Sequence, residues 1–288
     1  MIKNLNKLFS KLFRKSKKKF INKIIFLLGS NIIQNSRKNY NSVKSLYDVE
    51  VKVFSQNGED GILDFIIKKL NLTRPNFIEI GVQDYLESNT RFIYESYYPS
   101  GLIIDCQKNL NSIVKENINL WKGDLRIVEK FITSKNAEDT ILQNCDFDVD
   151  IFSLDIDGID YWVIKNLSEK INPKVFVVEY NPIFGPQIEV TVPDIEDFSR
   201  ENYHYSYLCY GASLRAFTEL FKKKGYYLLG VNRLRNNAFF ISNKFLKKEF
   251  FPNILDSSFS DFTNSLVRES RSKNGNLDFK TKKERKKV

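Results

Sequence analysis

The chain has 288 residues, 42% of them hydrophobic, and a formal net charge of +10 at pH 7, which suits one large α/β domain with flanking segments or two small domains. Its three cysteines are widely spaced and form no CxxC pair, which excludes a disulfide framework and a cysteine zinc site, and its single histidine excludes mechanisms that need two. This cysteine usage fits a reduced compartment, so we expect a cytoplasmic protein.

The positive charge is concentrated at the two ends of the chain. Residues 1–40 carry 11 lysines and arginines and no acidic residue, and residues 280–288 carry six lysines and arginines and one glutamate. Residues 41–279 therefore have a net charge of −6. A nucleic-acid groove needs positive charge on the folded body, so we do not expect nucleic acid as a partner.

Residues 1–28 predict one or two basic amphipathic helices. Apolar residues recur there at steps of three and four, and lysines with Arg14 occupy the other face. The apolar patch at 24–28 is too short to span a bilayer, which needs about 20 apolar residues, and no signal-peptide cleavage site is evident. Such a helix suits an anionic membrane surface, for example the inner face of a cell membrane. The alternatives are a packing arm or a disordered solubilising tail.

Downstream of this arm, short apolar runs alternate with helical patterns. Valines at 49, 51 and 53 predict a short edge strand, and residues 62–70 predict a helix. The strand–helix alternation predicts a doubly wound, Rossmann-like α/β fold with a mainly parallel sheet. The parallel strands are expected at 76–80, 101–105, 126–132, 150–155 and 174–180, with helices from about 88–90, at 136–145 and up to 167.

The pattern changes after the fifth predicted strand. Residues 182–210 contain three prolines, several acids and six aromatic residues, which predicts a long insertion that acts as a lid. A helix at 212–224 and an antiparallel strand pair at 226–231 and 238–241 follow. We divide the chain into a basic N-terminal arm (1–45), one domain (46–250) and a C-terminal extension with a basic tail (251–288).

Acidic residues stand at the ends of four predicted strands. Because the carboxyl ends of parallel strands meet at one edge of a sheet, these acids should converge on one crevice. Neighbouring carboxylates need compensation, which a hydroxyl-rich ligand or a hard divalent cation would supply. Some of them could instead cap helices or bind loop amides. The acids are Glu79 and Asp84, Asp105, Asp155 and Asp157, and Glu179.

Five residues of this region have more specific interpretations. Asp155 and Asp157, with Asn181, are candidate ligands of a cation such as Mg²⁺, and one of the two aspartates could be a general base. Asp105 follows Gly81 by 24 positions, which permits contacts with ribose hydroxyls as in dinucleotide-binding folds. His204 could act as a base, although a lone histidine among tyrosines is more often structural.

Four sets of segments together resemble a known family. They are FSQNGEDGIL (54–63), FIEIGVQD with ESNT (77–84 and 87–90), SLDIDGIDYW with VEYN (153–162 and 178–181), and YGASL with GY and NNAFF (210–214, 225–226 and 236–240). In order and spacing they resemble the FkbM-like branch of class I S-adenosylmethionine-dependent methyltransferases, in a subgroup associated with bacterial surface glycans. The resemblance spans about residues 50–245.

The resemblance implies a class I methyltransferase fold and methylation of a hydroxyl on a glycan or glycolipid precursor. We assign catalysis to Asp155, Asp157 and His204, with Asp155 and Asp157 also as the candidate metal ligands. S-adenosylmethionine would be bound by Glu79, Gly81, Val82, Asp84, Asn89, Asp105 and Asp155. The substrate would be bound by Gln56, Asn57, Glu59, Asp60, Glu179 and Asn181.

Two other functions remain open at this point. Gln83 and Tyr85 stand where a methyltransferase often has glycine, so a non-catalytic binding or scaffold protein that keeps the fold is the alternative. A nucleic-acid methyltransferase is favoured by the basic ends. The acidic body and the lack of an Asn-Pro-Pro-Tyr-type motif after the fourth strand count against it.

Overall fold

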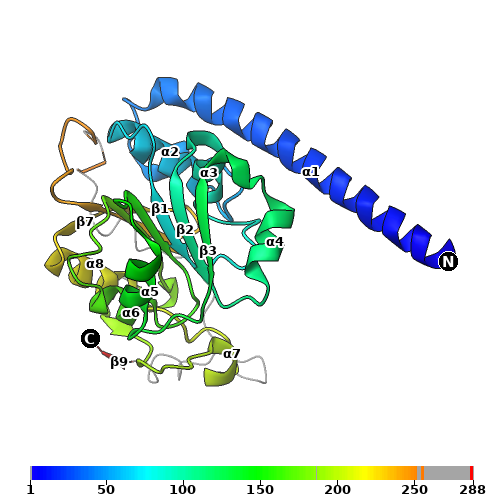
Figure 1. Cartoon of the computed structure of the whole chain (residues 1–288). Helices are drawn as coiled ribbons and strands as arrows, with labels where there is room; N and C mark the ends of the chain where they lie inside the picture. Colours follow the sequence, from blue (N-terminus) through cyan, green and yellow to red (C-terminus); the bar gives the residue numbers. More distant parts are fainter. Residues whose placement is uncertain (1, 186, 252–253, 256–285, 288) are drawn as a thin grey trace.

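A seven-stranded sheet with the order β3-β2-β1-β4-β5-β8-β7 forms the centre of the protein (Figure 1). The first five strands pair in parallel, and β8 runs antiparallel between β5 and β7. The fold is thus the predicted doubly wound, Rossmann-like sheet with an antiparallel C-terminal strand pair. The strands are β1 (Phe77–Ile80), β2 (Ser100–Asp105), β3 (Asp124–Glu129), β4 (Ile151–Leu154), β5 (Val175–Glu179), β7 (Tyr226–Val231) and β8 (Asn237–Ser242).

The computed structural model describes residues 2–185, 187–251, 254–255 and 286–287. Most of the predicted C-terminal extension, 251–288, lies outside the described residues. Within them, β6 (Val190–Thr191) pairs with β9 (Lys286–Lys287).

Helices cover both faces of the sheet because strand side chains alternate between the faces. Ile78 and Ile80 of β1 pack with α5 (Ala137–Asn144), α6 (Asp160–Asn166) and α8 (Leu214–Lys223). Phe77, one residue earlier, packs on the opposite face with α2 (Glu59–Lys69), α3 (Arg91–Tyr97) and α4 (Leu110–Asn117). All four residues of β1 are buried, as expected for the central strand of a parallel sheet.

The register places the carboxyl ends of the central strands side by side. Ile80, the last residue of β1, lies opposite Ile104 of β2 and Leu154 of β4. The amide of Gly81 donates to the carbonyl of Ile104 at 3.0 Å, and the amide of Asp155 donates to the carbonyl of Ile80 at 3.0 Å. The loops that follow these strands therefore begin from one edge of the sheet.

The N-terminal arm forms one helix, α1 (Ile2–Ser36), which extends beyond the prediction and projects away from the sheet (Figure 1). Its C-terminal half is packed against the body: the ring of Phe26 lies 6.3 Å from that of Phe54 and 6.0 Å from that of Phe92, and Ile33 is fully buried. None of the helices in the described part of the chain combines the length and apolar character that a bilayer span needs.

Arg37, directly after α1, joins the arm to the body through a buried carboxylate. Its Nε and Nη2 donate to the two oxygens of Asp64 at 2.9 and 2.6 Å. The hydroxyls of Tyr40 and Tyr97 also donate to this carboxylate, and the Asp64 side chain has no exposed surface.

We expect Asp64→Ala to lower the free energy of unfolding by about 2–3 kcal/mol in urea denaturation. This is less than the roughly 3–5 kcal/mol for breaking a fully buried ion pair, because Arg37 is 32% exposed. The matched control is Asp146→Ala, which removes an exposed partner of Arg126 and should change stability by less than about 1 kcal/mol. Equal effects of the two substitutions would contradict the anchoring role of Asp64.

Two sequence expectations need correction. The predicted edge strand at 49–53 is wrong: Leu46–Val49 is a 3₁₀ turn, and the amides of Val53 and Phe54 donate to the Asp60 carboxylate at 2.7 Å, so they are not available to a neighbouring strand. The third strand is shifted towards the N-terminus and ends at Glu129. The insertion at 182–210 contains a 3₁₀ turn (Pro182–Phe184), β6 and the short helix α7 (Arg200–Tyr203).

Candidate functional site

A cleft of about 440 Å³ opens at the carboxyl ends of β1, β2, β4 and β5. This is the edge at which open α/β sheets bind ligands, and the volume is in the range of small-molecule sites, about 300–1,000 Å³. The loops after the four strands line it, together with Glu196, Phe198 and Arg200 of the insertion. The sequence-assigned residues that line it are Gln56, Glu79, Gly81, Val82, Asn89, Asp105, Asp155, Asp157 and Glu179.

Gly81 begins the loop after β1 in a conformation that only glycine accepts easily. Its φ is +89°, and a Cβ atom there would lie 1.6 Å from the carbonyl oxygen of Asp155. The loops after β1 and β4 therefore meet with no side chain between them. This close approach lets the backbone itself form the floor of the cleft.

Gln83 and Tyr85, further along the same loop, also have left-handed backbone conformations, with φ of +49° and +59°. The ring of Tyr85 is fully buried, and its hydroxyl lies 2.9 Å from that of Thr90. Tyr85 does not line the cleft and so takes no space from a ligand, whereas Gln83 does line it. The loop after β1 thus has two left-handed positions, which glycine adopts most easily, but they are occupied by the larger residues Gln83 and Tyr85.

Glu79 holds the end of this loop through its buried carboxylate. It accepts hydrogen bonds from the hydroxyls of Ser88 and Thr90 and from the amides of Asn89 and Thr90. Burial raises the pKa of Glu79, and these donors counteract the rise. Thr90 stands at the start of the following helix, but its side chain bonds Glu79 and makes no cap hydrogen bond. Glu79 therefore positions Ser88 and Asn89 at the wall of the cleft.

Asp105 lies at the end of β2, at the side of the cleft. Its two oxygens accept the amides of Gln83 and Gln107 at 2.7 and 2.8 Å. The carboxylate thereby fixes the loop after β1 relative to β2. Each oxygen keeps a further lone pair, so Asp105 can still accept hydroxyl groups of a ligand.

Three acids form a cluster in the cleft: Asp155, Asp157 and Glu179, each with a carboxylate oxygen within 4.8 Å of the others. Burial and the neighbouring Asp157 and Asp160 raise the pKa of Asp155 to about 8. Burial and Asp155 also raise the pKa of Glu179, and burial raises that of Asp157. One oxygen of Glu179, Oε2, is buried and has no hydrogen-bond partner among the described residues. The cluster is therefore short of positive charge and of donors.

Arg200 of α7 supplies a cation to this cluster, and the sequence assignment missed it. Its guanidinium pairs with Asp157 and lies 5.3 Å from the centre of the Tyr210 ring. Phe198, two residues earlier, contacts the Gly158 region. The insertion thus contacts the residues of the cleft through the Arg200–Asp157 ion pair and through the ring of Phe198. A basic residue in an acid-rich insertion is the feature of the sequence that could have indicated Arg200. The sequence does not show that Asp157 is its ion-pair partner.

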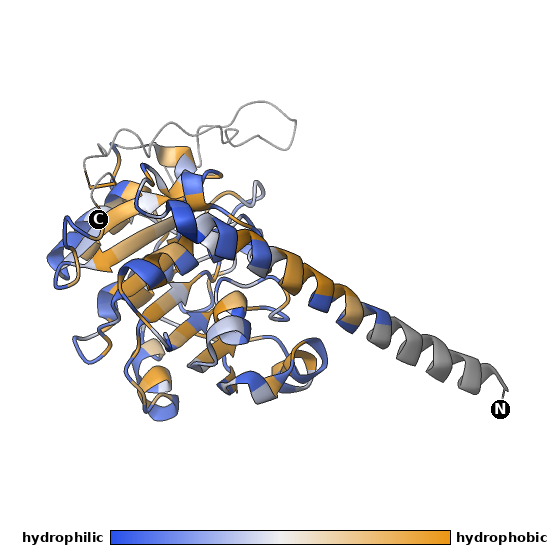
Figure 2. Cartoon of the chain, turned by 90° about the horizontal axis from the view of Figure 1, so that it is seen from above, coloured by the Kyte–Doolittle hydropathy of each residue, from blue (hydrophilic) through white to orange (hydrophobic). Residues whose placement is uncertain are grey.

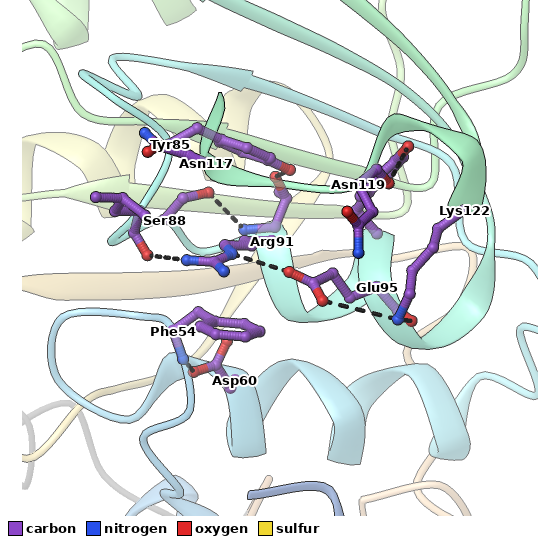
Figure 3. Close-up of polar contacts among 12 residues, drawn as sticks. Phe54, Asp60, Tyr85, Ser88, Arg91, Glu95, Asn117, Asn119 and Lys122 are labelled. Carbon is purple, nitrogen blue, oxygen red and sulfur yellow. Dashed lines mark hydrogen bonds and ion pairs between the residues drawn. The ribbon is translucent and has the colours of Figure 1, made fainter. Parts of the chain in front are cut away.

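The loop at 54–60 lies partly outside the cleft, although Gln56 lines it. Asp60 is buried and accepts the amides of Val53, Phe54 and Ser55, and burial raises its pKa to about 6. Figure 3 shows Phe54 next to Asp60. The Arg91 guanidinium lies 3.7 Å from the centre of the Phe54 ring. Arg91 in turn pairs with Glu95. This loop is held by its own polar contacts.

Five further assigned residues also do not line the cleft. The contacts of these five residues, given next, hold the fold together. We therefore assign no cofactor, substrate or catalytic role to them or to Asp60 in the proposal below. Glu59 accepts the side-chain amides of Asn232 and Asn237, and its neighbour Asn57 donates its backbone amide to Glu59. Asp84 accepts the amide of Leu86, Asn181 donates to the carbonyl of Leu208, and His204 lies within hydrogen-bond distance of Ser206.

Comparisons with known proteins give matches to solved structures alone. No family model matches the chain, and no curated protein sequence does. It is similar to a protein from Galdieria sulphuraria assigned as a sarcosine dimethylglycine methyltransferase, with 13% identity and a TM-score of 0.39 over 59% of this chain and 62% of that one. This chain thus spans less than two thirds of that relative.

Two other solved structures are S-adenosylmethionine-dependent methyltransferases. The one from Clostridium acetobutylicum has 12% identity and a TM-score of 0.38, over 62% of this chain and 89% of that one. The one from Thiobacillus denitrificans, in complex with S-adenosyl-L-homocysteine, has 13% identity and a TM-score of 0.36, over 66% and 70%. Likenesses this distant carry no argument about the substrate or the reaction, and none of them points to the FkbM-like subgroup.

Proposed function

We propose that the protein is an S-adenosylmethionine-dependent methyltransferase that methylates a hydroxyl group of a glycan or glycolipid precursor. The observation that carries the proposal is the cleft. A glycine turn, the carboxylate at the end of β2 and a cluster of acids short of positive charge meet there, at the ligand-binding edge of the sheet. The sequence resemblance to the FkbM-like methyltransferases supports the choice of reaction and of acceptor.

The residues of the cleft fit this cofactor in three respects. The backbone at Gly81 has no Cβ between it and the β4 loop, so a ligand can lie close to the main chain. Asp105 can accept ribose hydroxyls at the end of β2. Phe131 and Ile132 add an apolar wall suited to a flat ring system.

The acids of the cleft have two roles in this proposal: they balance the positive charge of the cofactor, and one of them removes the proton of the acceptor hydroxyl. When bound, S-adenosylmethionine supplies a methyl group already activated on a cationic sulfonium. In their ionised form, Asp155, Asp157 and Glu179 would attract such a cation, and their buried position would strengthen the attraction. Asp155, with its pKa of about 8, is the group we assign to remove the proton from the acceptor hydroxyl. Phe198 and Arg200 of the insertion would limit the access of water.

A divalent cation such as Mg²⁺ is a second way to neutralise the same cluster, since it prefers carboxylate oxygens. Asp155, Asp157 and Glu179 have suitable spacing for it. If a cation binds, Mg²⁺ should raise cofactor or acceptor affinity, and Glu179→Gln should remove the gain. If Mg²⁺ leaves the affinity for cofactor and acceptor unchanged, we infer that Arg200 and protons shared between the carboxylates neutralise the cluster.

A scaffold protein without cofactor was the alternative, because of Gln83 and Tyr85. That argument is weaker once their positions are known: both adopt the backbone conformation that glycine would adopt, and Tyr85 lies away from the cleft. The enzyme is therefore the function we retain.

Cofactor binding is tested by isothermal titration of S-adenosylmethionine into the folded protein. Asp105→Ala should weaken binding about 10- to 100-fold, because hydrogen bonds to a charged group contribute about 1.5–3 kcal/mol. The matched control is Asp124→Ala, an exposed aspartate at the start of β3 and so at the other end of the sheet, which should leave the affinity unchanged. No heat of binding to a sample that circular dichroism shows to be folded would refute the proposal.

A further inference from the structure

The C-terminal half of α1 exposes an unusual amount of apolar surface. Four of its large side chains recur at steps of four, and with Ile21 they form what we call the outward stripe. Figure 2 shows hydrophobic segments along α1 where the helix leaves the body of the protein. The exposed fractions are 65% for Phe20, 44% for Ile21, 40% for Ile24, 62% for Leu28 and 53% for Ile32. Large apolar patches of this kind on a soluble protein usually mark an interaction surface.

The protein body does not cover the outward stripe, because it is packed against the other side of the helix. Phe26 and Ile33 contact the body, and a Cβ atom at Gly29 would lie 2.5 Å from Val53. At 100° per residue, the stripe is centred roughly opposite these three positions. The docking of α1 therefore fixes the stripe so that it faces away from the domain.

The charge around the stripe indicates what covers it. At 100° per residue, exposed Lys17 lies on the stripe face, whereas Lys19 and Lys23 are exposed on the far side and flank of the same segment. Residues 1–40 contain 11 cationic residues and no acidic one, so two copies of α1 packed along their stripes would bring two strongly cationic segments together. The basic residues 280–288 would be repelled in the same way. A surface of anionic lipid headgroups above an apolar layer satisfies both the charge and the apolar side chains.

A tryptophan close to α1 agrees with this occupant. Trp121 is 78% exposed, the highest value for a large hydrophobic residue in the described part of the chain. The next residue, Lys122, places its ammonium 4.4 Å from the centre of the Phe26 ring, so Trp121 is next in sequence to a residue that contacts α1. Tryptophan prefers the interface between water and a membrane, where one side of the ring is apolar and the other hydrated.

We propose that α1 binds the protein to an anionic membrane surface, with the outward stripe immersed among the lipids and the domain held at the surface. The proposal stands on the helix and its charge, and it does not depend on the reaction performed in the cleft. For a methyltransferase of glycolipid precursors, it would bring the cleft to the layer in which such acceptors reside.

The test uses full-length protein and vesicles of phosphatidylcholine with or without phosphatidylglycerol, in a sedimentation assay. We expect binding to the anionic vesicles and little binding to pure phosphatidylcholine. Raising the salt from about 0.1 M to about 1 M shortens the screening length from about 10 Å to about 3 Å and should release the protein. The double substitution Ile24→Gln, Leu28→Gln should weaken binding about tenfold or more, because it removes apolar surface without changing the charge.

Leu234→Gln is the matched control, since Leu234 is 59% exposed and lies in the turn between β7 and β8, outside α1. It should change vesicle binding less than about twofold. Tryptophan emission should shift to the blue on addition of anionic vesicles, and Trp121→Phe should abolish the shift because Trp162 is buried.

Three results would overturn the proposal. Equal sedimentation with neutral and anionic vesicles would show that charge plays no part. Equal losses from the double variant and Leu234→Gln would show that the stripe is not the contact. Absence of binding together with a dimer in light scattering, which the double variant returns to monomer, would assign the stripe to a second copy of the chain.

Discussion

Asp155→Asn should lower the rate of methyl transfer by about 10²- to 10⁴-fold, the usual contribution of a general base, while the protein stays folded and binds cofactor. The substitution keeps the size of the side chain and removes its ability to take a proton. Single-turnover measurement with radiolabelled cofactor and a glycan acceptor would give the rate. The control, Asp139→Asn, changes an exposed aspartate on α5 and should leave the rate unaltered.

The same assignment predicts the pH profile. Asp155 acts in its ionised form, and its pKa is raised to about 8, so the rate of the unmodified protein should rise with pH and level off above about 8. Below that pH it should fall about tenfold per unit. Asp155→Asn should show a flat profile over this range. A variant that retains the rise, or most of the rate, would exclude Asp155 as the base.

Gly81→Ala should lower the free energy of unfolding by about 3–4 kcal/mol and abolish cofactor binding. The new Cβ would lie 1.6 Å from the carbonyl oxygen of Asp155, so the loops after β1 and β4 would have to separate. Urea denaturation gives the first quantity and isothermal titration the second.

Gly225→Ala separates the backbone strain from this clash. Gly225 has a φ of +82°, close to the +89° of Gly81, but a Cβ there would have no heavy atom within 4 Å. It should therefore cost only about 1 kcal/mol, the strain of a left-handed alanine. Equal losses at the two positions would show that the contact between the loops does not matter.

The sheet was predictable from sequence because its strands are short apolar runs bounded by glycine, proline and acids. β1, β2, β4 and β5 lie within two residues of the predicted limits. The edge strand at 49–53 failed because alternation of valines does not show that the backbone amides there bond to Asp60. The spacing of apolar residues indicates which way side chains face. The backbone conformation here is instead set by amides that donate hydrogen bonds to the side chain of Asp60.

The site was predictable where it depends on strand ends. Asp105, Asp155 and Glu179 come together because parallel strands deliver their carboxyl ends to one edge. Arg200 could not be found in this way, since the insertion that bears it has no register with the sheet. Glu59 was misplaced for a different reason: a polar loop in the sequence looks the same whether its acids face a ligand or neighbouring side-chain amides, as Glu59 does.

The place of β8 in the sheet has a consequence for how the protein is made. β5 is apolar and buried, and one of its two neighbours, β8, ends at Ser242, about 60 residues later in the chain. At a synthesis rate of about 5–20 residues per second, the hydrogen-bonding edge of β5 stays unpaired for about 3–12 s after it is made. During synthesis this nascent edge is open to other chains and to chaperones, and its protection begins when β8 inserts between β5 and β7.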